Sequence, residues 1–140
     1  MQFILSVLEG EFGFIGINRP DLVNIPETYQ KNNSNFWIAI ENDKVIGTIA
    51  LENHSDNRGY LKRFYVDKAY RGKGIAQQLL AALVQYAKDN NYKKILLATF
   101  EDLVAANKFY NKTGFIRIES LPKDMDDGDG EMFYQMDIGK

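Results

Sequence analysis

The sequence predicts one α/β domain, built on a mixed and mostly antiparallel sheet with helices on its faces. Three segments rich in β-branched and aromatic residues follow one another over residues 36–66, which is typical of an antiparallel meander. Further along, a helical pattern lies between two strand-type segments and predicts a βαβ unit with a right-handed crossover. The 140 residues fit a single domain, 1–140.

The first third of the chain has the least regular pattern. Closely spaced apolar residues over 3–8, followed by Gly10 and Gly13, predict a short helix that runs into a loop. Pro20 and Pro26 interrupt residues 18–35, where Asp21 can cap a turn or a short helix. We expect this third to be irregular, with one helical piece.

The meander begins with a hairpin. Residues 36–40 and 45–52 are apolar runs on either side of the polar turn 41–44. Residues 59–66 form the third strand. Phe36 and Trp37 are expected in the core.

The second half alternates helices and strands. Apolar residues recur at helical spacing over 75–90, and Asn90 and Asn91 end that helix. Residues 93–100 are nearly all apolar, as in a strand buried on both faces. A short helix over 103–113, stopped by Gly114, precedes strands at 115–120 and 131–138.

Composition excludes several kinds of chemistry. The chain has no cysteine and one histidine, His54, so disulfides, thiolate nucleophiles and Cys/His zinc sites are absent, and no metal site is expected. His54 lies in a polar stretch that is typical of a surface turn, so we expect it to be solvated. The acidic residues Asp124, Asp126 and Asp127 do not fit the calcium-loop pattern and predict a solvated loop that could attract a cationic substrate.

Charge and hydropathy set expectations for partners. A net charge of -2 gives no general attraction to nucleic acid or to an anionic membrane. No apolar stretch is long enough to span a membrane, and no signal peptide is readable at the start. We therefore expect no nucleic-acid or membrane partner and a cytoplasmic location.

The sequence Tyr70–Leu80 places two glycines and two cations in front of the central helix. Backbone N–H groups at a helix start favour an anion, Gly72 and Gly74 let a phosphate approach, and Arg71 and Lys73 add charge. Neither the dinucleotide fingerprint nor the P-loop motif is present. A tight turn with solvated cations is the alternative.

Two motifs resemble those of a known family. Arg71-x-x-Gly74-x-Ala76 resembles the Q/R-x-x-G-x-G/A signature of the GNAT superfamily of N-acyltransferases, and residues 105–115 resemble its second signature. The resemblance covers about residues 36–115, and residues 19–29 are similar to a bacterial subgroup. It implies a sheet with one splayed parallel pair, and acetyl-CoA (coenzyme A) as co-substrate without a metal.

The same resemblance implies a set of site residues. Tyr110 is the general acid, and the cofactor is bound by Phe64, Tyr65, Val66, Arg71, Gly72, Lys73, Gly74, Ile75, Ala76, Gln77 and Asn107. Tyr110 as a core aromatic and Asn107 as a helix cap are the structural alternatives. Members of the family usually open with an edge strand, whereas this chain is predicted to start at a helix. The presence of the first strand is therefore left open, and the alternative is an edge covered by the N-terminal segment or by a second subunit in a homodimer.

These residues predict an N-acetyltransferase that acts on a primary amine. Without cysteine there is no acyl-cysteine intermediate, so the amine of a small molecule or peptide attacks the thioester directly in a ternary complex. The general base is open between Glu52, Glu101 and a chain of waters. The alternative functions are a catalytically silent module that binds acyl-CoA and a nucleotide-binding protein.

Overall fold

In the part of the chain that the structure describes, the fold is a single mixed sheet with two α-helices on one of its faces. A computed structural model describes residues 4–7, 34–125 and 130–139, and for residues 4–7 only the backbone. The strands are β1 (Ile4–Val7), β2 (Asn35–Glu41), β3 (Lys44–His54), β4 (Arg58–Val66), β5 (Lys94–Thr99), β6 (Ile116–Ile118) and β7 (Met132–Asp137). The α-helices are α3 (Ile75–Asp89) and α4 (Val104–Lys112), and two 3₁₀ turns, η1 (Ser55–Asn57) and η2 (Lys68–Tyr70), flank β4.

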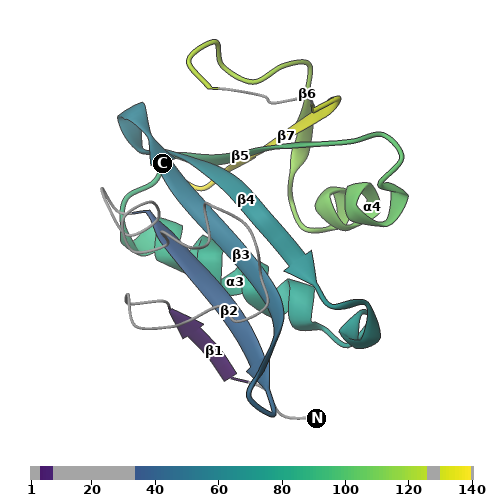
Figure 1. Cartoon of the computed structure of the whole chain (residues 1–140). Coiled ribbons are helices and arrows are strands. Elements are labelled where there is room, and N and C mark those ends of the chain that lie inside the picture. The colour runs from purple at the N-terminus through teal and green to yellow at the C-terminus, as the bar shows by residue number, and fades with distance from the viewer. Residues whose placement is uncertain (1–3, 8–33, 126–129, 140) are drawn as a thin grey trace.

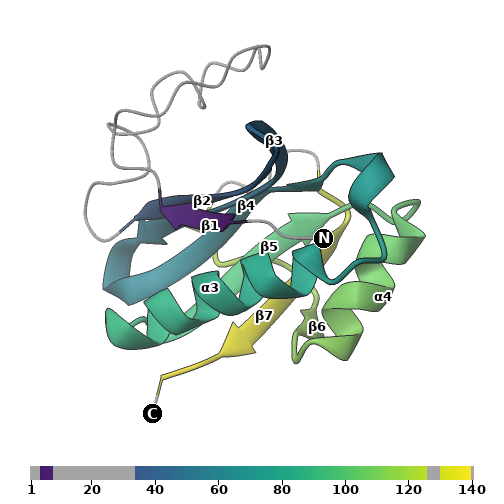
Figure 2. The same ribbon diagram turned by 90° about the horizontal axis from the view of Figure 1, so that it is seen from below.

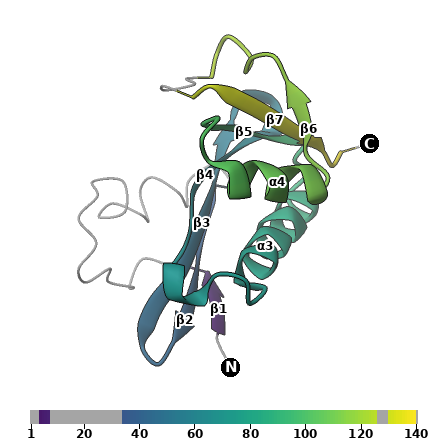
Figure 3. The ribbon, with the colours of Figure 1, turned by 90° about the vertical axis from the view of Figure 1, so that its right-hand side faces the viewer.

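The sheet has seven strands in the order β1-β2-β3-β4-β5-β7-β6. Every neighbouring pair is antiparallel except β4 and β5, which are parallel. This confirms the predicted mixed sheet, its hairpin and its βαβ unit. Figures 2 and 3 show α3 and α4 on the same side of the sheet.

The predicted start of the chain is wrong. Residues 4–7 form strand β1, which pairs antiparallel with β2 from Ile4 opposite Ile40 to Val7 opposite Trp37. A short apolar run has no decisive period of its own, so the free edge of β2 determines its structure. The first edge strand is therefore present. The irregular segment predicted over residues 18–33 lies outside the described residues.

The parallel pair β4–β5 separates after three residue pairs. Arg58, Gly59 and Tyr60 pair with residues 94–96, yet β4 continues to Val66 and β5 to Thr99. Figure 1 shows the two strands diverging toward their carboxyl ends. Beyond Tyr60, no described residue pairs with the edge of β4 that faces β5, which is the splay that the resemblance implied.

A β-bulge lies in the separated part of β4. Thr48 pairs with Tyr65 and Ala50 with Lys62, so β4 holds one residue more than β3 over this stretch. Arg63, within the bulge, has a positive φ of 51°, and its carbonyl oxygen accepts a hydrogen bond from the Thr48 hydroxyl at 2.7 Å. Bulges of this kind redirect side chains beside functional sites.

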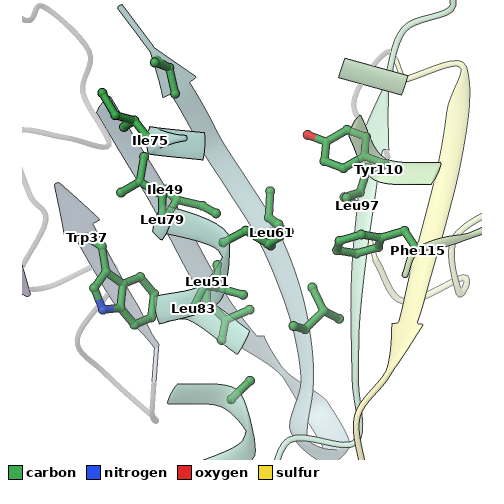
Figure 4. Close-up of a cluster of buried hydrophobic side chains, with 14 of the residues drawn as sticks. Trp37, Ile49, Leu51, Leu61, Ile75, Leu79, Leu83, Leu97, Tyr110 and Phe115 are labelled. Carbon is green, nitrogen blue, oxygen red and sulfur yellow. The ribbon is translucent and has the colours of Figure 1, made fainter. Parts of the chain in front are cut away.

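The main core lies between α3 and the sheet. Leu79 and Leu83 of α3 pack against Ile49 and Leu51 of β3 and Leu61 of β4 (Figure 4). As predicted, Phe36 and Trp37 are buried. A smaller cluster occupies the opposite face, where Tyr60 and Leu96 meet residues after β6 and in β7; its other members are Leu121, Met125 and Phe133.

Candidate functional site

A cavity of about 590 Å³ lies at the splay, between the end of β4 and helix α4. Strand β4 contributes residues 64–66 to its lining, and α4 contributes Val104, Ala106 and Tyr110. Arg71 and Ala76 bring the start of α3 to the same cavity. Three elements that are separate in the sequence therefore share one site.

The glycine turn leads into this cavity with a backbone that few other residues adopt. Gly72 and Gly74 have φ of +78° and +84°, and a Cβ placed on either would meet no heavy atom within 4 Å. The glycines are therefore required by conformation, and the space beside them is open. The two cations of the turn, Arg71 and Lys73, are exposed.

The start of α3 is not capped by a side chain. Gly74 is its N-cap, and the first hydrogen bond of the helix runs from the Gln78 N–H to the Gly74 carbonyl at 3.1 Å. The N–H groups of residues 75–77 precede this bond and carry the positive end of the helix dipole. The Ile75 side chain is buried in the core, so a ligand here would meet its backbone.

Arg71 is held against the end of β4. Its Nε donates a hydrogen bond to the Val66 carbonyl oxygen at 3.0 Å. Nearby, the Asp67 carboxylate accepts a hydrogen bond from the Ala69 N–H at 3.0 Å and pairs with Lys44 at 3.2 Å. The Ala69 N–H and Lys44 lower the pKa of Asp67. These contacts hold the first part of the connection from β4 to α3 against the end of β4.

Tyr110 lines the cavity from α4 and is 7% exposed. Its ring lies among those of Phe64, Phe115 and Tyr134, with centroids 5.5 to 6.3 Å apart. Burial, and to a smaller extent Tyr134, raise the pKa of Tyr110 to about 12. The phenol is therefore protonated at neutral pH. Figure 4 shows its oxygen directed toward the side on which β4 lies.

Asn107 is buried behind the cavity wall. Its Nδ2 donates to the carbonyl oxygens of Phe100 and Leu103, both at 2.9 Å, and its Oδ1 accepts from the Tyr134 hydroxyl at 3.2 Å. These bonds fix the segment that joins β5 to α4, and Leu103 of that segment lines the cavity. Asn107 itself does not line the cavity, and its contact with a cofactor stays a prediction.

The candidate general bases lie on different parts of the sheet. Glu52 is on β3, with its carboxylate 3.5 Å from Lys62 Nζ and 3.6 Å from His54 Nε2. Glu101 follows β5 and borders a second cavity of about 610 Å³, together with Phe100, Asp102, Leu103 and Glu131. His54 ends β3 and is partly buried, so it is not the solvated turn residue that its polar neighbours predict. Asp126 and Asp127 lie outside the described residues.

Sequence reasoning missed the apolar rim of the cavity on the side of α4. Leu103 and Val104 there are 47% and 57% exposed, and they lie across the cavity from Tyr65, which was predicted and is 51% exposed. Ala106 and Phe109 of α4 also line the cavity. The short apolar stretch before Asn107 was the only available signal in the sequence. It predicted a helix, but it did not show which side of that helix faces the cavity.

Two features are absent from the part of the chain that the structure describes. No group of three or more His, Cys, Asp or Glu side chains there could hold a metal ion. Within the same residues, no helix is long and apolar enough to cross a membrane.

Comparison with known proteins places this site in a family. The family model of the acetyltransferase (GNAT) family matches residues 4–115, which include β4, the glycine turn, α3 and α4. The chain belongs to the GNAT acetyltransferase family.

Several curated proteins are similar to this GNAT member. The N-acetylaspartate synthetase of Xenopus tropicalis is 40% identical over 99 residues, which are 69% of this chain and 36% of that protein. N-alpha-acetyltransferase 30 of Schizosaccharomyces pombe is 34% identical over 89 residues, which are 61% of this chain and 59% of that protein. The chain spans about a third of the length of the N-acetylaspartate synthetases that it matches.

Solved GNAT structures share the fold. A GNAT acetyltransferase from Staphylococcus aureus Mu50 superposes with a TM-score of 0.81 at 35% identity, over 88% of this chain and 81% of that one. A GNAT acetyltransferase from Elizabethkingia anophelis, solved with acetyl-CoA bound, has a TM-score of 0.68 at 18% identity, over 97% and 98% of the chains. The second likeness concerns the fold alone.

Proposed function

We propose that this GNAT member is an N-acetyltransferase that transfers an acetyl group from acetyl-CoA to a primary amine in a ternary complex. The observation that carries this proposal is the cavity, which connects the uncapped start of α3 and the unpaired end of β4 to the protonated phenol of Tyr110. The acetyl-CoA found in the Elizabethkingia anophelis relative and the signatures in the sequence support the same ligand.

The residues around the cavity fit coenzyme A. The N–H groups of residues 75–77, the open space beside Gly72 and Gly74, and the cations Arg71 and Lys73 suit a diphosphate. The pantetheine arm would lie along residues 64–66, where the edge of β4 that faces β5 has no strand partner among the described residues. Because Arg71 Nε already binds the Val66 carbonyl, this cation is held beside the diphosphate site.

The chain's own residues favour direct transfer. The thioester supplies the activated acetyl group, and a chain without cysteine cannot carry that group on a thiol of its own. A thiol has a pKa of about 8.5, so its sulfur leaves readily as a thiolate and needs only a nearby proton. Tyr110, with a pKa of about 12, keeps its proton for that purpose.

The acceptor is proposed as the amine of a small molecule or a peptide. Two relatives are named as an N-acetylaspartate synthetase and an N-alpha-acetyltransferase, so L-aspartate and peptide amino termini come first in a panel of amines. The single domain over 1–140, a cytoplasmic location, the absence of nucleic-acid and membrane partners and a homodimer stay predictions.

A binding assay and an activity assay test the proposal together. We expect coenzyme A and acetyl-CoA, and not ATP, to raise the melting temperature. Thiol release from acetyl-CoA should then rise with at least one amine in a panel of L-aspartate, other amino acids, tetrapeptides and spermidine. Stabilisation without thiol release would support the catalytically silent module instead. If coenzyme A at saturating concentration gives no stabilisation, the cofactor site is wrong.

A further inference from the structure

The transfer reaction requires a proton acceptor, and the central strands offer one carboxylate. An acceptor amine with a lysine-like pKa of about 10.4 is protonated at neutral pH and cannot attack in that form. Strands β3, β4 and β5 enclose the splay, and their sequences contain a single acidic residue, Glu52. We propose that Glu52 is the general base that deprotonates the acceptor amine; this inference rests on the proposed function.

The position of Glu52 follows from the register of the sheet. Glu52 lies opposite Tyr60, the residue of β4 that makes the last pair with β5 before the strands separate. Side chains alternate along a strand, and Leu51 packs in the core beneath α3. Glu52 therefore faces the other side of the sheet, level with the closed end of the splay.

The acceptor would approach from that side of the sheet. Helices α3 and α4 lie on the first side (Figure 3), and α4 and the start of α3 line the cofactor cavity. A cofactor bound there would place its thioester between the strands and leave the opposite face for an amine in a ternary complex. Glu52 is on this face and does not line the cofactor cavity, as expected for a group that meets the acceptor.

Glu52 lies beside basic side chains and is partly open to water. Lys62 Nζ lies 3.5 Å from Oε1, and His54 Nε2 lies 3.6 Å from the same oxygen. The Glu52 side chain is 27% exposed. Tyr60 and Arg58 are the other ionisable groups opposite this part of β3, and Lys62 Nζ lies 5.2 Å from the Tyr60 ring centroid. Because the side chain is partly exposed, Glu52 can pass a captured proton to solvent.

The proton balance is complete with residues of this chain. Glu52 takes one proton from the ammonium, and the freed lone pair forms the C–N bond as the C–S bond breaks. The departing sulfur receives a proton from Tyr110. The second proton lost by the nitrogen reaches solvent, from which Tyr110 regains its own. The net products are the amide, coenzyme A as a thiol and one released proton.

The test compares Glu52→Gln with wild type over a range of pH, with the panel amine that gives the highest kcat/KM. At pH 7 we expect kcat/KM to fall by about 100-fold or more, the usual contribution of a general base. The difference in kcat/KM between the variant and wild type should become smaller as the pH rises toward the pKa of the amine, because more of the substrate is then already deprotonated. Stabilisation by coenzyme A should match wild type. Asp89→Asn, at the far end of α3, is the control for loss of one charge.

Two results would overturn the assignment. One is a Glu52→Gln variant that stays within twofold of wild type at pH 7, and the other is a deficit of equal size at every pH, which indicates a structural defect. Should Glu52→Gln fail to fold, Glu52→Asp keeps the charge and must show an intermediate rate with the same narrowing. If wild type releases no thiol with any amine in the panel, the proposed function fails and not this assignment.

Discussion

Tyr110 combines the features of a core aromatic with those of a proton donor. Its ring packs among four others, yet its side chain borders the cavity. The same burial that places the ring in the core raises the pKa of the hydroxyl to about 12. A structural and a catalytic explanation therefore describe the same contacts, and only a variant that removes the hydroxyl and keeps the ring separates them.

Tyr110→Phe should reduce kcat by about 100-fold while the affinity for acetyl-CoA stays close to wild type. The ring packing is retained, whereas the sulfur loses its general acid. Steady-state kinetics and a thermal shift with coenzyme A measure the two quantities. Tyr86→Phe, which removes a hydroxyl from α3 beside Trp37, is the control and should behave as wild type. An unchanged kcat in Tyr110→Phe would make this tyrosine purely structural.

The raised pKa of Tyr110 also predicts alkaline sensitivity. In the unfolded chain its phenol loses a proton near pH 10, whereas the folded protein keeps that proton until about pH 12. The stabilisation is fully present below pH 10 and is lost as pH rises toward 12. The loss is about 3 kcal/mol, since the pKa shift spans about two units and each unit is worth about 1.4 kcal/mol.

Urea denaturation between pH 9 and 12 measures this loss. Tyr110→Phe should show a shallower decline in the free energy of unfolding than wild type, because its ring cannot ionise. Parallel curves for the two proteins would contradict the assignment of the shift to burial of this phenol.

At the scale of elements, the sequence predicts the connection from β4 to α3 well and the start of the chain poorly. The glycines, cations and helix periodicity of residues 70–89 act locally, so the turn and α3 were predicted from sequence. Strand β1 depends on pairing with β2, which lies about 30 residues away, and no local pattern expresses that pairing. The short apolar run was therefore assigned to a helix.

The candidate site divides in the same way. The residues that line the cavity from β4 and the start of α3 were predicted, because the resemblance to the GNAT signatures implies them. The bulge at Arg63 and the internal bonds of Asn107 were not, since a positive φ and a partner 27 residues away leave no pattern in the sequence. Glu52 became the proposed general base only when the register placed it opposite Tyr60.

The start of α3 can be tested with two variants of equal size. Gly74→Asn and Gly74→Asp both put a side chain on a residue with φ of +84°, which asparagine and aspartate tolerate better than most. A negative charge at a helix start stabilises the free protein, so Gly74→Asp should be at least as stable as Gly74→Asn. The same charge should repel a diphosphate, so Gly74→Asp should bind coenzyme A more weakly.

Of the two variants, Gly74→Asp is thus expected to be the more stable and Gly74→Asn the tighter binder of coenzyme A. Urea denaturation gives the stability and titration calorimetry with coenzyme A gives the affinity. Equal affinities in the two variants would show that no phosphate lies near this helix end.

At the scale of the whole molecule, ligand binding should stabilise the complete fold. Coenzyme A at 100 times its Kd is expected to raise the free energy of unfolding by about 2.7 kcal/mol if only the folded protein binds. Urea denaturation with and without the ligand measures the gain. Arg71→Glu reverses the charge beside the glycine turn and should lose most of it. An equal gain from ATP would argue against selective recognition of coenzyme A.

The short parallel pairing has a mechanical consequence. The sheet consists of two halves, β1 to β4 and β5-β7-β6, and among the described residues their only direct ladder has three residue pairs. Backbone hydrogen bonding between neighbouring strands is thus least extensive where the ligand is proposed to lie. A pantetheine arm bound along β4 would bridge the two halves of the sheet. Binding of the cofactor should therefore reduce the motion of one half relative to the other.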